Sequence, residues 1–329
     1  MGHMRTRPRT DCPCCAGAGR VLYRGIVDVL YGAPGEWGFR QCTNAACGAL
    51  WLDPSPVPQD LLLAYQSYHT HEVQKPRSGR APLTRVFRAG LGALAAASGL
   101  LRERQRADSM FLEGAEAGRL LDVGCGQGAF IARMARSGWS VRGVDMDPAA
   151  VRTARELHGL DIRVGGIESV SGAASVDVIT ASHVIEHLAD PHEFLAHCRR
   201  LLAPRGKVIL RTPNAESLGH RLYGRNWRGL EAPRHLCLFT PRALTNVAIR
   251  AGFAVNGCFT SDAMSESILV VSQILRMGGS LDPGTGSKWA LRIAKTAGPL
   301  LALGARLYWL CDRGSGEEVC AIFSRDAGA

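Results

Sequence analysis

The sequence predicts an α/β fold in which helices cover both faces of a mostly parallel sheet. From Arg119 onward, short apolar runs typical of strands alternate with segments whose apolar residues recur at helical spacing. The connections between them are short, and a glycine-rich turn follows the first strand. Parallel sheets are built from this alternation of strand and helix.

The composition is that of an ordinary globular protein of about two domains. The chain has 329 residues, of which 46% are hydrophobic and 21% charged. No apolar run reaches the ~18–20 residues of a membrane span, and no secretory signal opens the chain. Eleven cysteines without such a signal indicate a reducing compartment, and we expect a cytoplasmic location. The net charge of +10 leaves nucleic acid or an acidic small molecule open as partners.

Residues 5–58 are predicted to form a small zinc-ribbon-like module. Two cysteine pairs are spaced like zinc ligands, and Arg20–Asp28 and Trp37–Gln41 between them fit two short strands. A segment this short buries too little apolar surface to fold without a staple, which favours a metal over a reduced metal-free loop. Four thiolates leave no open coordination position, so the expected Zn²⁺ is structural. The expected ligands are Cys12, Cys15, Cys42 and Cys47, with Cys14 as an alternative to Cys15.

Residues 59–118 are predicted to be a helical connector or lid. Asp60–Tyr65 fits a short helix, and Leu91–Leu112 is rich in Ala and Leu and fits a longer one that packs on the next domain or covers its ligand. Between them, Lys75–Arg88 is basic and poor in acidic residues. We interpret this stretch as a solvated connector rather than a nucleic-acid contact.

Residues 119–261 are predicted to form the core sheet and its helices. Proline near the start of three of the helices supports their N-termini, because proline fits the first helical turn. The predicted strands are Leu120–Val123, Ser140–Asp145, Asp161–Val164, Val176–Ala181, Lys207–Arg211 and Ala254–Ser261. The predicted helices are Ala129–Ser137, Pro148–His158, Asp190–Leu202 and one that opens at Thr240-Pro241.

The last part of the chain combines a helical insertion with a final strand. Residues 262–317 contain two apolar segments at helical spacing, Ser265–Met277 and Lys288–Asp312, and the second is expected to break at Gly298-Pro299. We expect the insertion to form a lid or a homodimer face, with a membrane-surface role as the alternative because its edge is basic. Residues 318–329 supply the last strand, Glu318–Arg325, and a tail.

The glycine-rich turn after the first strand indicates the class of ligand. Gly124-Cys-Gly126-Gln-Gly128 lets the backbone approach a ligand at the start of the next helix. Asp122 stands just before the glycines, where a carboxylate suits a ligand with positive groups and no phosphate. Asp145 ends the second strand, where a carboxylate can accept hydrogen bonds from both hydroxyls of a ribose.

A chain of motifs in the core resembles a known family. Asp122–Gly128 together with Asp145 resembles the first two motifs of class I S-adenosylmethionine-dependent methyltransferases, and the resemblance spans residues 119–259. It implies a Rossmann-like seven-stranded sheet whose last strand is antiparallel. The cysteine segment followed by Leu52–Pro56 resembles a zinc-bearing subgroup that acts on small molecules, including sugars and specialised metabolites. Further matching segments are Ser182–Leu188, Asp190-Pro191, Leu202–Lys207, Thr212–Asn214 and Gly252-Phe253.

The resemblance also implies which residues bind S-adenosylmethionine. The glycine loop would hold the amino-acid end of the cofactor, and Asp145 would hold the ribose. Residues after the second and third strands would flank the adenine, and those after the fourth would face the methionine part. The implied residues are Asp122, Gly124, Cys125, Gly126, Gly128, Asp145, Met146, Ile167, Glu168, Ser182 and His183.

Three side chains after the fourth strand are candidates for the chemistry. His183, Glu186 and His187 lie on one short turn at the carboxyl edge of the sheet. Histidine titrates near neutral pH, so His187 or His183 suits a general base. Two alternatives stay open. Some relatives bind a divalent cation through a Glu-x-x-Glu-His-like pattern that this turn matches in part, and His187 could instead bond to backbone.

A polar loop between the fifth strand and the following helix supplies the remaining candidates. Residues 223–235 are too irregular for a core element, and long loops at such positions are often functional. Tyr223 and Trp227 are expected to stack on a planar or sugar substrate. Arg234 and His235 are expected to contact an acidic one, and His235 is a further candidate base. Anchoring of the loop is the alternative role.

These expectations combine into a methyltransferase that acts on a small molecule. We predict in-line methyl transfer from S-adenosylmethionine to O, N or C of a specialised metabolite or sugar-type acceptor, acidic or phosphorylated, with a histidine base. The alternative is an RNA or other nucleic-acid methyltransferase that uses the zinc module and the basic surface. Ala-Ser-His-Val at the end of the fourth strand argues against it, since methyltransferases of base amino groups typically carry Asn/Asp-Pro-Pro-Tyr there.

Overall fold

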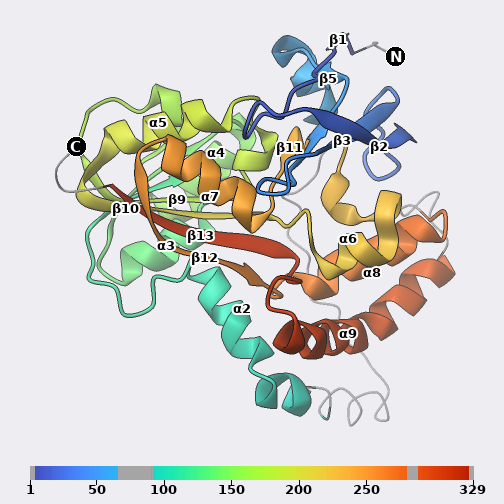
Figure 1. The fold of residues 1–329 in the computed structure, drawn as a ribbon. Helices are drawn as coiled ribbons and strands as arrows, with labels where there is room; N and C mark the ends of the chain where they lie inside the picture. Colours follow the sequence, from blue (N-terminus) through green and yellow to red (C-terminus); the bar gives the residue numbers. More distant parts are fainter. Residues whose placement is uncertain (1–3, 66–89, 91, 280–287, 326–329) are drawn as a thin grey trace.

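The computed structural model describes residues 4–65, 90, 92–279 and 288–325, and of residues 288–296 it describes the backbone (Figure 1). The predicted connector Lys75–Arg88 lies outside these ranges. Within them, none of the helices has the length and apolar character needed to cross a bilayer.

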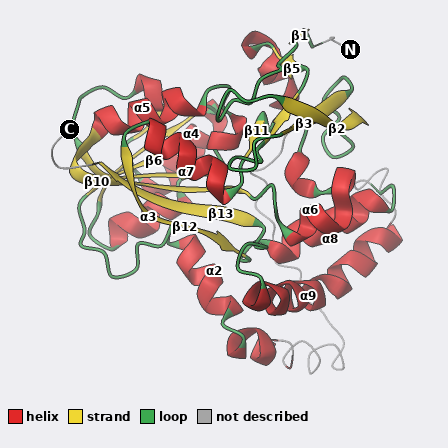
Figure 2. Cartoon of the chain, viewed as in Figure 1, coloured by secondary structure: helices red, strands yellow, loops and turns green. Residues whose placement is uncertain are grey.

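The largest sheet in the described part of the chain has seven strands. Figure 2 shows this sheet with helices around it. Its spatial order is β12-β13-β10-β9-β6-β7-β8. The pairs from β10 to β8 are parallel, whereas β13 runs antiparallel to both β10 and β12. The predicted α/β fold with an antiparallel last strand is therefore confirmed. The strands are β6 (Arg119–Val123), β7 (Ser140–Asp145), β8 (Ile162–Val164), β9 (Val176–Ser182), β10 (Leu202–Pro213), β12 (Phe253–Ser261) and β13 (Glu318–Arg325).

Helices bury both faces of this sheet. Leu120 and Leu121 are neighbours in β6 yet belong to two different core clusters, because successive strand residues point to opposite faces. The cluster around Leu121 includes residues of α5 and α7, and the cluster around Leu120 includes residues of α3 and α4. The helices are α3 (Ala129–Arg136), α4 (Pro148–His158), α5 (Pro191–Leu201) and α7 (Pro241–Arg250).

The N-terminal cysteine-rich segment forms a second, four-stranded sheet of order β11-β4-β3-β2. Strands β2 (Gly19–Ile26) and β3 (Trp37–Cys42) are the hairpin that the sequence predicts, and β4 (Leu50–Leu52) follows. The fourth strand, β11 (Cys237–Leu238), comes from the loop after β10 and pairs with β4. The N-terminal segment and the loop with the candidate substrate residues thus share one sheet. The segment also contains β1 (Thr6–Arg7), β5 (Ser55–Pro56) and the 3-10 helix η1 (Pro58–Tyr65).

Two predicted helices differ from the structure. The helix expected over Leu91–Leu112 is interrupted at Gly99, whose φ is +78°, and α2 occupies only Leu100–Asp108. Conversely, α9 (Lys288–Cys311) continues through Pro299, where we expected a break. A proline inside a helix costs roughly 3 kcal/mol. Contacts with α8 (Ser265–Arg276) offset this cost, because Val270 comes within 3.2 Å of the position that a Cβ at Gly298 would occupy.

Candidate active site

The glycine loop joins β6 to α3 at the carboxyl edge of the sheet. Gly124 has a φ of +72°, and a Cβ there would lie 2.5 Å from Val184 Cγ2, so only glycine fits. Val184 belongs to the turn after β9, which therefore packs directly on the loop. Gly126 and Gly128 also have positive φ, and the chain enters α3 immediately afterwards. Within the loop, the N–H groups of Gly124 and Cys125 donate to the Val144 carbonyl, and that of Gly128 donates to the Cys125 carbonyl.

Two carboxylates adjoin the loop. Asp122 is buried and accepts a hydrogen bond of 2.6 Å from the Thr180 hydroxyl. Burial raises the pKa of Asp122 to about 7, and the nearby charge of Asp145 also raises it. Asp145 accepts hydrogen bonds from the backbone N–H groups of Gly126 (2.7 Å) and Asp147 (2.8 Å). A positively charged ligand beside Asp122 would favour the ionised form of this buried carboxylate and so offset the cost of its burial.

The other expected cofactor residues follow neighbouring strands of the same edge. Met146 comes directly after β7 and is 65% exposed, whereas Ile167, after β8, is buried. The Glu168 carboxylate accepts a hydrogen bond from the Gly166 N–H and so closes its own turn. Ser182 is the last residue of β9, and the buried Cys125 side chain packs in the core against Gly143 of β7.

His183 is held between two buried carboxylates. Its Nδ1 lies 3.2 Å from Glu186 Oε1 and its Nε2 lies 2.8 Å from Glu318 Oε1. Burial lowers the pKa of His183, but hydrogen bonds to the two carboxylates and their charges outweigh it and raise the pKa to about 9. Both ring nitrogens therefore donate, and the ring is an imidazolium near neutral pH. In this structure His183 has no lone pair with which to accept a proton, so it does not suit the base role that the sequence suggested.

Glu186 and Glu318 keep their negative charge inside the protein. Burial raises the pKa of Glu186, but His183 and two further histidines lower it to about 2. Its second oxygen accepts a hydrogen bond of 3.0 Å from the Thr212 hydroxyl. Glu318 also accepts from the Arg211 guanidinium at 2.8 and 3.0 Å. An alternating row of charges therefore runs from Arg211 through Glu318 and His183 to Glu186.

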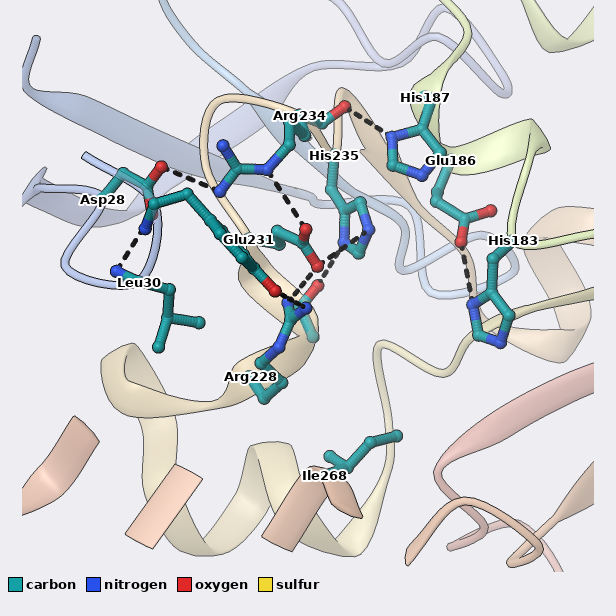
Figure 3. A network of polar contacts seen from close by, with 12 residues as sticks. Asp28, Leu30, His183, Glu186, His187, Arg228, Glu231, Arg234, His235 and Ile268 are labelled. Carbon is teal, nitrogen blue, oxygen red and sulfur yellow. Dashed lines mark hydrogen bonds and ion pairs between the residues drawn. The ribbon is translucent and has the colours of Figure 1, made fainter. Parts of the chain in front are cut away.

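His187 and His235 face each other beside Glu186, as Figure 3 shows. Their ring centroids are 4.8 Å apart at an interplanar angle of 69°. Nδ1 of His187 lies 3.1 Å from the Arg234 carbonyl oxygen, and Nδ1 of His235 lies 2.7 Å from that of Gly229. A carbonyl oxygen only accepts, so a proton on Nδ1 is donated to it in each contact. The Tyr65 hydroxyl lies 3.0 Å from the same Nδ1 of His187. Burial lowers the pKa of His235 to about 4, which keeps that ring neutral.

The predicted substrate contacts are placed differently from our expectation. Trp227 is 1% exposed and donates its indole N–H to Glu317 Oε2 at 3.0 Å. Arg234 is fully buried and ion-paired, and Tyr223 is 9% exposed. Neighbouring elements enclose each of these three side chains, so all three pack inside the protein. Of the four residues, His235 alone joins the histidine pair.

Sequence reasoning missed several groups that shape the site. The carboxyls of Glu317 and Glu318 open the last strand, and the Tyr65 hydroxyl lies 3.0 Å from His187 Nδ1. Burial raises the pKa of Glu317 to about 7. The sequence did offer one signal for these two carboxyls, because two adjacent acidic residues stand where an otherwise apolar strand begins. Nothing local in the sequence pointed to Tyr65, because 122 residues separate it from His187.

The four expected zinc ligands converge in the N-terminal module. Their sulfur atoms all lie within 4.8 Å of one another, with Cys12 to Cys47 at 3.7 Å and Cys15 to Cys42 at 3.5 Å. Zn–S bonds of about 2.3 Å in a tetrahedron give S···S separations of about 3.8 Å, so the cluster fits the ion. The alternative ligand Cys14 is buried beside this cluster: its sulfur lies 3.6 Å from that of Cys237 in β11, and hydrogen bonds with the Cys12, Cys237 and Cys47 thiols raise its pKa.

Comparison with known proteins points to one kind of domain. Residues 96–256 match the family described as "Methyltransferase domain". The ubiquinone biosynthesis O-methyltransferase of Xanthomonas oryzae pv. oryzae (strain PXO99A) is 41% identical over 104 residues, 29% of this chain and 43% of that protein. The enzyme of the same name from Caulobacter sp. (strain K31) is 43% identical over 103 residues, 29% of this chain and 41% of that protein. The chain thus spans less than half the length of these relatives.

Solved structures resemble the chain more broadly but at lower sequence identity. An S-adenosylmethionine-dependent methyltransferase from Mesorhizobium loti has a TM-score of 0.46 and 15% identity, covering 67% of this chain and 97% of that one. A methyltransferase from Archaeoglobus fulgidus has a TM-score of 0.45 and 19% identity, covering 69% and 94%.

Proposed function

We propose that this chain, which carries an S-adenosylmethionine-dependent methyltransferase domain over residues 96–256, methylates a hydroxyl oxygen of a small molecule. The observation that carries the proposal is the position of His187 on the turn that packs against the glycine loop, with Nδ1 3.1 Å from the Arg234 carbonyl oxygen, so that Nε2 is left for the acceptor hydroxyl. The names of the relatives, which are O-methyltransferases, support oxygen as the acceptor atom.

The cofactor site consists of the glycine loop and the residues that follow β7, β8 and β9. The backbone of Gly124–Gly128 and the Asp122 carboxylate would hold the cationic amino-acid end, and Asp145 the ribose hydroxyls. Met146, Ile167 and Glu168 would border the adenine, and Ser182 the methionine part. When bound, S-adenosylmethionine supplies a methyl group on a sulfonium, which is a good leaving group. The protein then has to align the acceptor and remove its proton.

His187 is the base in this proposal. Its Nδ1–H is held by the Arg234 carbonyl, so the Nε2 lone pair keeps one direction. No residue that the structure describes donates a hydrogen bond to this Nε2. The Glu186 carboxylate next to it would stabilise the imidazolium that forms when the acceptor hydroxyl is deprotonated. His235 stays neutral and shapes the pocket around the base.

A divalent cation at the same residues is the second candidate. One ligand atom each from Glu186, His187 and His235 lies within 4.8 Å of the other two. Both histidines donate Nδ1–H to a carbonyl, as metal-ligating histidines do. A bound cation would orient the acceptor oxygen and lower its pKa in place of the base. Activity after mild chelation that leaves any zinc of the cysteine cluster in place separates the two, because only the cation mechanism requires a metal at Glu186, His187 and His235.

We further propose that the cysteine cluster binds one structural Zn²⁺. The four sulfurs would occupy every tetrahedral position, so the ion would stabilise the small sheet without taking part in catalysis.

Two measurements test the proposed function. Calorimetric titration should give stoichiometric binding of S-adenosylmethionine and its demethylated product. A panel of hydroxylated small molecules, with an RNA oligonucleotide as a separate arm, should then yield a methylated product from the first class only. Absence of cofactor binding would refute the proposal, and methylation of RNA alone would favour the nucleic-acid alternative.

A further inference from the structure

The histidine pair rests on a buried network of charges that reaches the N-terminal module (Figure 3). Arg234 is fully buried and donates to three segments of the chain. Its guanidinium bonds Asp28 Oδ2 at 2.8 Å in the loop after β2, Glu231 Oε1 at 3.1 Å, and the Ala64 carbonyl at 2.8 Å in η1. A buried guanidinium with this many partners has one allowed orientation.

The backbone of Arg234 lies beside both histidines. Its carbonyl oxygen accepts the Nδ1–H of His187, and its neighbour His235 directly follows it in the chain. On the other side, Leu236 N–H donates to the Glu186 carbonyl at 2.7 Å, and Cys237 pairs with Trp51 of β4. The N-terminal module therefore holds the short segment 234–238 from both ends.

Asp28 links this segment to the N-terminal hairpin loop. Its side chain is 3% exposed. The carboxylate accepts from the N–H groups of Leu30 (3.2 Å), Tyr31 (3.1 Å) and Ala33 (3.0 Å), so its own turn orients it. The Tyr31 ring also lies under the Arg234 guanidinium, 4.6 Å from its centroid. Capping of the turn does not by itself require the Asp28 carboxylate to lie against a buried arginine.

We propose that Asp28 is a positioning residue for methyl transfer: through Arg234 it sets the direction of the His187 and His235 rings. The inference rests on the proposed function, and it means that the N-terminal module completes the active site. Without the carboxylate, Arg234 loses one of two anionic partners and the 234–238 segment loses one of its two anchors. The histidine rings would then sample both tautomers.

The test compares Asp28→Asn with the wild type. The amide oxygen can still accept from Leu30 and Tyr31, whereas the amide nitrogen cannot accept from Arg234. We expect kcat to fall roughly tenfold to hundredfold, because small misplacements of a base have effects of this size. The cofactor Kd should stay within about twofold, since the glycine loop is separate from the network. Asp177→Asn, which removes the partner of Arg119 at the start of β6, is the matched control and should leave both values unchanged.

A second readout does not depend on turnover. Imidazole ¹⁵N spectra should show His187 and His235 as neutral rings with the proton on Nδ1 in the wild type, and tautomer averaging in Asp28→Asn. Should Asp28→Asn fail to fold, Tyr65→Phe removes the hydroxyl beside His187 Nδ1 without unpairing a charge and should perturb the same ring. Unchanged spectra together with unchanged kcat would overturn the proposal. If the wild type methylates no hydroxyl, the proposed function fails, while the spectra still decide the positioning role.

Discussion

At the scale of single residues, three histidines that look equivalent in the sequence differ in their hydrogen-bond partners in the structure. His183 lies between two carboxylates, whereas Nδ1 of His187 and Nδ1 of His235 each lie within hydrogen-bond distance of a backbone carbonyl. The sequence could place His183 and His187 on one turn, because both follow a predictable strand. It could not identify the base, because the deciding partners Glu318 and Arg234 come from distant segments.

The base assignment predicts a selective loss of turnover. His187→Ala should lower kcat by roughly 10²- to 10⁴-fold, the usual contribution of a general base, while the cofactor Kd stays unchanged. His197→Ala is the matched control, because this partly exposed histidine of α5 pairs only loosely with Glu193. Steady-state kinetics and calorimetry check the prediction. Equal kcat in the two variants would contradict the role of His187.

The cofactor site predicts that affinity for S-adenosylmethionine depends on pH. The pKa of Asp122 is raised to about 7, so its carboxylate becomes protonated as the pH falls below that value. The neutral form attracts a cationic ligand less, so the Kd should rise by up to tenfold per pH unit below about 7. Calorimetry between pH 5.5 and 8.5 measures this dependence. Asp122→Asn should bind weakly with a flat profile, and an equally steep profile in that variant would exclude Asp122 as the cause.

At the scale of elements, β11 shows what local sequence patterns miss. Its two residues pair with β4 across 186 positions, so no local periodicity reveals it. The strands of the central sheet were predictable, because each is an apolar run between turn residues. The continuity of α9 could not be predicted in this way. Packing of α8 against Gly298 outweighs the tendency of Pro299 to break the helix.

The cysteine cluster of the N-terminal module is expected to bind one zinc ion. Metal analysis should find about one Zn²⁺ per chain, and Cys42→Ser should lose it and melt at a lower temperature. Cys311→Ser, which changes an exposed cysteine of α9, is the control and should retain both metal and melting temperature. Full metal content in Cys42→Ser would refute this ligand set.

At the scale of the whole molecule, the N-terminal segment and the core share a sheet and a buried charge network. The predicted division at residues 58 and 118 followed the cysteine spacing and the onset of alternating strands and helices, and such local patterns cannot detect a strand donated from residue 237. The seven-stranded sheet with its antiparallel last strand, in contrast, is what the family resemblance of the motif chain implied.

Global stability should decrease at alkaline pH. The pKa of His183 is raised from 6.5 to about 9 in the folded protein, so its stabilising contribution is fully present below about pH 6.5. That contribution is lost as the pH rises through about 9. Thermal unfolding between pH 6.5 and 9.5 should therefore show a falling Tm, with a shallower fall in His183→Gln. Parallel curves for the two proteins would contradict the charged state of His183.

The most direct test of the central claim follows a labelled methyl group. Wild-type protein is incubated with S-adenosylmethionine carrying a ¹³C-methyl group and a hydroxylated acceptor from the panel, and the product is analysed by NMR. We expect label on oxygen for the wild type and its near absence for His187→Ala, although that variant still binds the cofactor. Label on nitrogen or carbon, or undiminished oxygen methylation by His187→Ala, would contradict this claim.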